Sequence, residues 1–81
     1  MKTEEELLKR IVANPKIMGG KLTIKGTRIT IEQLLKLLAQ GLSADEIIRD
    51  YPHISKEDIS AVLLYAAKVA GEEEVYLITV V

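Results

Sequence analysis

The order of apolar and polar residues repeats one pattern three times in the second part of the chain. Each copy reads apolar, Ser or Thr, two free positions, acidic or amide, apolar, and the copies begin at Ile29, Leu42 and Ile54. In such a pattern the hydroxyl accepts a hydrogen bond from the N–H three residues on, while the acidic or amide side chain reaches back to the cap's own N–H. The two apolar residues close as a hydrophobic staple. The pattern therefore predicts three helix starts.

The residues between these starts set the helix lengths. We expect helices over residues 31–39, 44–50 and 56–70, with Gly41 and Gly71 as their C-terminal glycines and Pro52 ending the second. The link between the second and third helices is short. Three helices joined in this way predict a tri-helical, helix-turn-helix-like unit.

The residues that flank this unit have the character of strands. In residues 16–29, Gly19-Gly20 forms a corner, residues 22–24 a strand, and Gly26 a turn into residues 28–29, which predicts a hairpin. Residues 10–13 fit helix or strand, and Thr3 with Glu6 is a weaker helix start. The β-branched and aromatic residues 75–81 predict a strand that pairs within the chain, across a dimer or with a partner protein. The expected fold is one domain, mostly α with a small β-sheet.

Composition bounds the size of the core and the cellular setting. A chain of 81 residues buries only about 60–65% of its unfolded surface, yet 48% of these residues are hydrophobic. The excess of apolar surface predicts a homodimer or a tightly held partner. There is no cysteine, no basic-then-apolar leader and no apolar run of membrane-spanning length, so we expect a cytoplasmic protein without membrane association.

Residues for catalysis are scarce in this sequence. His53 is the sole histidine and has no cysteine to act with, and the serines of the repeated pattern serve as helix caps. The run Gly19-Gly20-Lys21 lacks the spaced glycine and the following Ser or Thr of a phosphate loop. We therefore expect no enzyme activity, no cofactor and no metal site.

Two interpretations of the third helix stay open. In the first, the helix and the basic hairpin bind DNA, and the residues nearest to it are Lys21, Lys25, Thr27, Arg28, Lys56 and Ser60. Against it stand a net charge of −1, the acidic pair Glu57-Asp58 and an outward face without Arg, Asn or Gln to contact base edges. In the second, which these residues favour, the helix is a core and dimer helix. Its inner arc then carries Ile59, Val62, Leu63, Ala66 and Val69, and its other arc includes Ala61. The dimer or partner surface would comprise Leu64, Tyr65, Ala67, Val75, Tyr76, Leu77 and Ile78.

Two stretches resemble a known family. The run from Asn14 to Lys21, followed by Ile24-Lys25-Gly26-Thr27-Arg28-Ile29, is similar to the signature of the family called domain of unknown function 433. Residues 41–67, with the run Asp50-Tyr51-Pro52-His53-Ile54, resemble its helical half. Leu22 and Lys25 stand where the family often has proline and arginine.

The resemblance implies a homeodomain-like or winged helix-turn-helix fold, usually as a homodimer. It further implies an antitoxin of a type II toxin–antitoxin pair, which binds a PIN-like ribonuclease toxin and, as a complex, represses its own operon by binding operator DNA. The alternative is a dimeric protein-interaction module that does not bind DNA directly.

Overall fold

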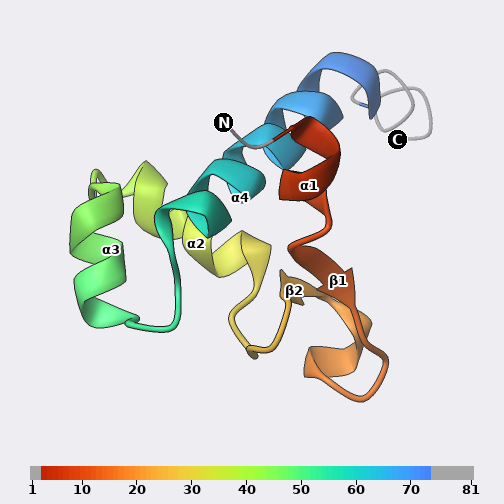
Figure 1. Ribbon diagram of the computed structural model, residues 1–81, viewed down its shortest axis with the longest axis horizontal. Coiled ribbons are helices and arrows are strands. Elements are labelled where there is room, and N and C mark those ends of the chain that lie inside the picture. The colour runs from red at the N-terminus through yellow and green to blue at the C-terminus, as the bar shows by residue number, and fades with distance from the viewer. Residues whose placement is uncertain (1–2, 74–81) are drawn as a thin grey trace.

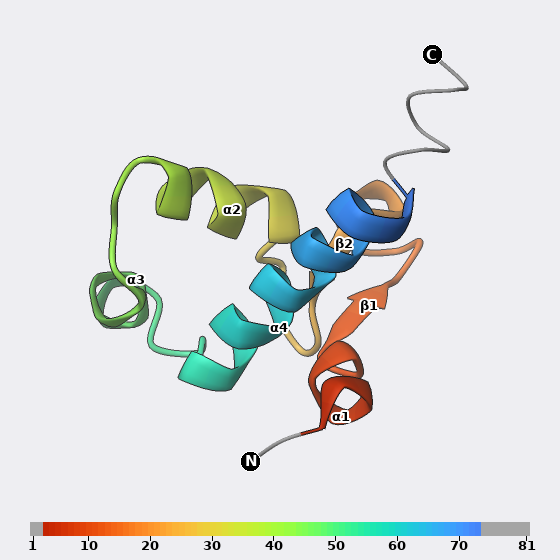
Figure 2. The same cartoon turned by 90° about the horizontal axis from the view of Figure 1, so that it is seen from above.

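The computed structural model describes residues 3–73, which are mostly helical with a small antiparallel sheet (Figure 1). The elements in chain order are α1 (Glu4–Leu8), β1 (Ile11–Ala13), the 3₁₀ turn η1 (Met18–Gly20), β2 (Leu22–Ile24), α2 (Ile31–Ala39), α3 (Ala44–Asp50), α4 (Lys56–Lys68) and the π-helical turn η2 (Val69–Glu73). In Figure 2, α3 is seen end-on while α2 and α4 lie across the view, so α3 is steeply inclined to both. No helix in the described part of the chain is long and apolar enough to cross a membrane.

The three helix starts lie where the repeated pattern predicts them, at Thr30, Ser43 and Ser55. Both serines form complete capping boxes, in which the third helical residue also accepts from the cap's backbone N–H. The predicted box at Thr30 is only half formed. Thr30 accepts from the N–H of Gln33, but the Gln33 side chain donates to the Tyr51 hydroxyl at 3.1 Å instead of returning to the cap. The amide thereby joins α2 to the end of α3.

The two predicted C-terminal glycines behave differently. Gly41, with φ +96°, follows α2, and the N–H of Leu42 donates to the carbonyl of Leu37 as in a Schellman motif. Gly71 does not end the last helix, contrary to the prediction. Its φ is not in the left-handed region, and the chain continues through it as a π-helical turn to Glu73.

The sheet differs from the predicted hairpin in its pairing. The strand β2 pairs antiparallel with β1, in register Ile11 to Ile24, so residues 11–13 are a strand. On its other side β2 makes only an isolated bridge between Thr23 and Thr30, with Ile24 donating to the carbonyl of Ile29. The predicted strand at residues 28–29 is wrong because the chain enters the Thr30 cap before a second ladder can form. The predicted strand at 75–81 lies outside the described residues.

The core is built mainly from the apolar residues of the capping pattern. Its fully buried members are Ile24, Ile31, Leu34, Ile47, Ile54, Ile59 and Val62, and Ile29 and Leu42 pack against them. The predicted inner arc of α4 is wrong at two positions, since Ala61 is fully buried and Leu63 is 49% exposed. The reason is α1, which packs along α4. Lys68, two turns after Ala61, pairs with Glu4 of α1 at 3.3 Å, so α1 covers the face on which Ala61 lies.

Candidate functional site

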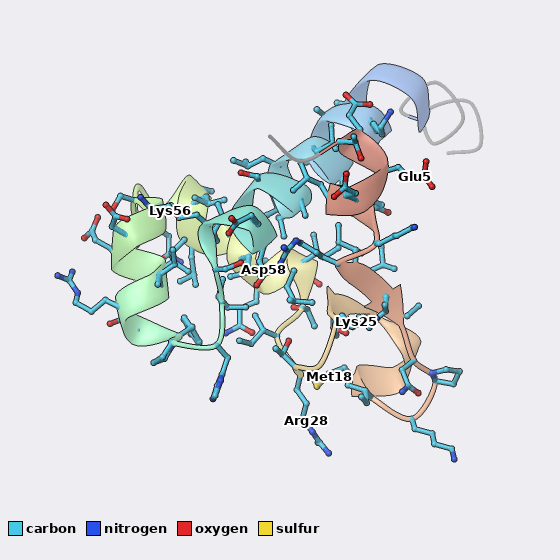
Figure 3. All side chains as sticks on the ribbon, in the orientation of Figure 1. Glu5, Met18, Lys25, Arg28, Lys56 and Asp58 are labelled. Atoms are coloured by element: carbon cyan, nitrogen blue, oxygen red, sulfur yellow. The ribbon has the colours of Figure 1, made fainter. Side chains whose placement is uncertain are left out.

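The basic residues of the hairpin region lie on turns, and most point into solvent. Lys21, Lys25 and Arg28 are all exposed. Figure 3 shows Arg28 extending away from the body of the protein, on the same side as Met18 of η1. Thr27 has a different role: its hydroxyl donates to the carbonyl of Ile24 and accepts from the N–H of Ile29, which fixes the turn. The structure therefore presents cations here, while the hydroxyl of Thr27 is used internally.

The backbone next to these cations is strained at one residue. Met18, Gly19 and Gly20 have successive φ values of +51°, +66° and +83°, and Met18 is the member that bears a side chain. A side chain in the left-handed region costs about 1–2 kcal/mol. Met18 is nevertheless 46% exposed, so burial of its side chain does little to offset this cost.

The two candidate DNA residues of α4 lie apart from the hairpin. Lys56 begins α4 and pairs with Asp45 of α3 at 3.5 Å, and Ser60 is exposed one turn further on. Figure 3 shows Lys56 over α3, well separated from Lys25 and Arg28. The six predicted DNA residues thus divide between two places on the molecule.

The carboxylate of Asp58 is not available at the surface. Its side chain is 8% exposed and lies 3.1 Å from Nη1 of Arg10, and its second oxygen accepts from the N–H of Ser55 in the capping box. In the sequence, the carboxylates of Glu57 and Asp58 together argue against DNA binding at the start of α4. The structure leaves only Glu57 exposed there, because the Asp58 charge is buried and paired.

The outward stripe of α4 is mostly uncharged. Exposed residues recur along it with helical spacing: Lys56, Ser60, Leu63 and Ala67. Of the predicted interface residues, Ala67 lies on this stripe, whereas Leu64 and Tyr65 are half-buried. Leu63, which the sequence assigned to the core, is its large apolar residue. Val75, Tyr76, Leu77 and Ile78 lie outside the described residues.

An apolar groove between α2, β2 and α4 was not predicted. It has a volume of about 580 Å³, and its lining residues are Lys21, Leu22, Thr30, Ile31, Glu32, Leu35, Lys36, Ala39 and Tyr65. One pattern in the sequence indicates one wall of this groove. Ile31, Leu35 and Ala39 follow at four-residue spacing on α2, and such spacing places them on one face. What lies opposite that face is decided by the packing of Leu22 and Tyr65.

The rim of this groove is basic on balance. Glu32 lies 3.1 Å from the Lys36 ammonium and 3.9 Å from that of Lys21, so two cations share one carboxylate. The hydrogen bond and charge of Lys36, with a smaller contribution from Lys21, lower the pKa of Glu32 below its usual value. Glu32 therefore stays ionised at neutral pH, and the rim carries a net positive charge.

His53 is exposed in the turn between α3 and α4. In the described part of the chain, no group of three or more His, Cys, Asp or Glu side chains could hold a metal ion. The prediction that the protein is not an enzyme stays a prediction.

Comparison with known proteins identifies the family to which this chain belongs. The family model described as "Protein of unknown function (DUF433)" matches residues 11–66, from β1 to the later part of α4. The chain belongs to the DUF433 family. A crystal structure of a DUF433 member protein from Anabaena variabilis ATCC 29413 is 30% identical, with a TM-score of 0.69. The similarity covers 86% of this chain and 66% of that one, just under two thirds of its length. No curated protein sequence matches this DUF433 chain.

Proposed function

We propose that this DUF433 protein is an antitoxin-like component of a type II toxin–antitoxin pair, which binds a PIN-like ribonuclease and contacts operator DNA through its basic turns. The observation that carries the proposal is the joint presence of a helix-turn-helix, α3–α4, and a turn region whose Lys25 and Arg28 side chains are exposed. The toxin-binding part of the proposal rests on the family resemblance.

The contacts to DNA would be mainly to phosphates. Arg28 extends into solvent (Figure 3), and no ion pair to Lys25 or Arg28 occurs within residues 3–73. Contacts of this kind position a protein on the duplex and make binding dependent on salt, whereas sequence is read from base edges. On the stripe of α4, Lys56 and Ser60 would contact base edges. The carboxylate of Asp58 beside them is buried in its ion pair with Arg10.

The first test is co-expression with the neighbouring open reading frame, followed by purification and measurement of the mass of the complex. We expect a stoichiometric complex with a small ribonuclease. A chain that emerges alone would contradict the toxin-binding part of the proposal.

The second test is a titration of the purified complex with the DNA upstream of its own gene, at several salt concentrations. We expect binding that weakens steeply with salt, and a K25E/R28E double variant whose log–log salt slope is smaller by about two. Arg49→Glu in α3 is a control with a single charge reversal at the opposite end of the molecule from the sheet (Figure 1), and its slope should fall by no more than about one. Equal slopes for the wild type and the double variant would exclude the hairpin as a DNA contact.

The α4 stripe favours a second candidate function, a dimeric protein-interaction module without direct DNA binding. Leu63 is 49% exposed and Ala67 lies one turn further along, so this face resembles a protein contact more than a base-reading surface. This candidate predicts no specific DNA shift even at low salt, together with a dimer that persists. Specific DNA binding by the isolated protein would exclude it.

A further inference from the structure

We propose that the apolar groove between α2, β2 and α4 receives the C-terminal segment, residues 75–81, of a second copy of this chain, so that two copies exchange their ends. This inference does not depend on DNA or on a toxin. It concerns a surface that is separate from the α4 stripe and shares only Lys21 with the basic turns.

The groove suits an apolar peptide with alternating side chains. Its lining comes from Leu22 of β2, Leu35 and Ala39 of α2 and Tyr65 of α4, in a volume of about 580 Å³. In an extended chain successive side chains face opposite sides, so Tyr76, Ile78 and Val80 fall on one face. A segment that binds a groove in this way gains specificity from alternate side chains.

The charges on the two surfaces are complementary. The rim carries Lys21 and Lys36, which share the single carboxylate Glu32. The segment is preceded directly by Glu72, Glu73 and Glu74. Carboxylates arriving at the rim would therefore meet ammonium groups that one glutamate only partly neutralises.

The course of the chain favours a second copy over the segment's own groove. The helix does not stop at Gly71 but continues to Glu73, about 12 Å of helical rise beyond Tyr65 in the groove. A return to the same groove needs a sharp reversal directly after Glu73. Residues 74–81 contain no Gly, Pro, Asn or Asp, the residues that reverse a chain most readily. Reciprocal exchange between two copies needs no such turn and gives a closed, two-fold dimer.

The first test measures the mass in solution by sedimentation velocity. We expect the wild-type chain to have about twice the 9.0 kDa mass of one copy. A chain ending at Glu74 and the variant Ala39→Arg should both be monomers, with dimer dissociation constants raised at least about tenfold. Ala39 is exposed at the end of α2, so the arginine fills the groove without removing core contacts. Circular dichroism checks that each variant keeps its helices.

Ala13→Arg is the matched control, an exposed alanine on β1 outside the groove. It should leave the dimer intact. Three results would each overturn the proposal: a monomeric wild type, dimers of both the truncated chain and Ala39→Arg, or dissociation by Ala13→Arg alone.

A cross-linking experiment identifies whose segment occupies the groove. The chain has no cysteine, so Ala39→Cys and Ile78→Cys can be placed on separate copies, mixed and treated with a short bis-maleimide linker. We expect a cross-linked pair of chains from the mixture. A cross-link that forms only when both cysteines are in one chain would show that the segment fills its own groove. The absence of a cross-link in both samples would exclude the groove as the binding site of the segment. Both results overturn the proposal.

Discussion

Arg10 and Asp58, 48 residues apart in the sequence, form an ion pair in which Nη1 lies 3.1 Å from Oδ1. Arg10 directly precedes β1, and Asp58 lies in the first turn of α4, so the pair fastens the sheet to the helix-turn-helix. The same carboxylate accepts from the N–H of Ser55 in the capping box. One buried side chain therefore joins a local helix start to a distant strand.

The loss of this carboxylate should be costly. Replacing Asp58 by alanine removes the acceptor of the Ser55 N–H and leaves Arg10 without its partner, and we expect a loss of about 2–3 kcal/mol in the free energy of unfolding. The expected loss is below that of a fully buried pair because the Arg10 side chain is 31% exposed. Urea unfolding measures it. The double-mutant cycle with Arg10→Ala should give a coupling of about 1–2 kcal/mol, and additive losses would show that the two side chains do not interact in solution.

The hydroxyl of Thr23 should be a source of instability. Thr23 is 1% exposed, and its Oγ1 has no hydrogen-bond partner within the described part of the chain. Valine has nearly the same shape without the polar atom, so Thr23→Val should raise the free energy of unfolding by about 1 kcal/mol and the melting temperature by about 4–8 °C. Thr23→Ser, which keeps the hydroxyl and loses a methyl group, is the control and should destabilise. A destabilising valine would contradict the prediction.

Gly41 and Gly71 should respond in opposite directions to replacement by alanine. Gly41 has φ +96°, so Gly41→Ala should cost about 1 kcal/mol. Gly71 lies in η2 without a positive φ, and a Cβ there meets nothing within 4 Å. Gly71→Ala should therefore gain about 0.5–1 kcal/mol by restricting the unfolded chain. Thermal unfolding of the two variants measures both changes in stability. A Gly41→Ala variant more stable than the wild type would contradict the left-handed conformation at Gly41.

The capping box at Ser43 should contribute stability that depends on pH. The hydrogen bond from the Ser43 backbone, then that of its side chain, lowers the pKa of Glu46. A lowered pKa in the folded state means that the stabilisation is present above the unfolded pKa and is lost as the pH falls through the folded pKa. The advantage of the wild type over Glu46→Gln should therefore shrink between about pH 5 and pH 3.

The control for this experiment is Glu46→Ala, which has no acceptor at either pH. The difference in melting temperature between the glutamine and alanine variants should stay constant as the pH falls. If the difference in melting temperature between the wild type and Glu46→Gln is the same at about pH 5 and pH 3, Glu46 contributes no pH dependence to stability.

The sequence by itself determined the helices that follow the repeated pattern. Caps and staples act within six residues, so the starts at Thr30, Ser43 and Ser55 and the end near Gly41 needed no knowledge of the rest of the chain. The family match over residues 11–66 covers all three of these helix starts. The turn at Lys25 and Gly26 followed for the same reason.

The tertiary structure decided what depends on contacts between distant segments. Strand pairing is such a contact, and β2 forms its ladder with β1, while residues 29–30 make only a hydrogen bond and an isolated bridge to it. The packing of α1 on α4 buried Ala61 and left Leu63 exposed, although their spacing on the helix suggested the reverse. The Arg10–Asp58 pair and the groove between Leu35 and Tyr65 could not be predicted either, because each joins elements whose relative positions are fixed only by the packed core.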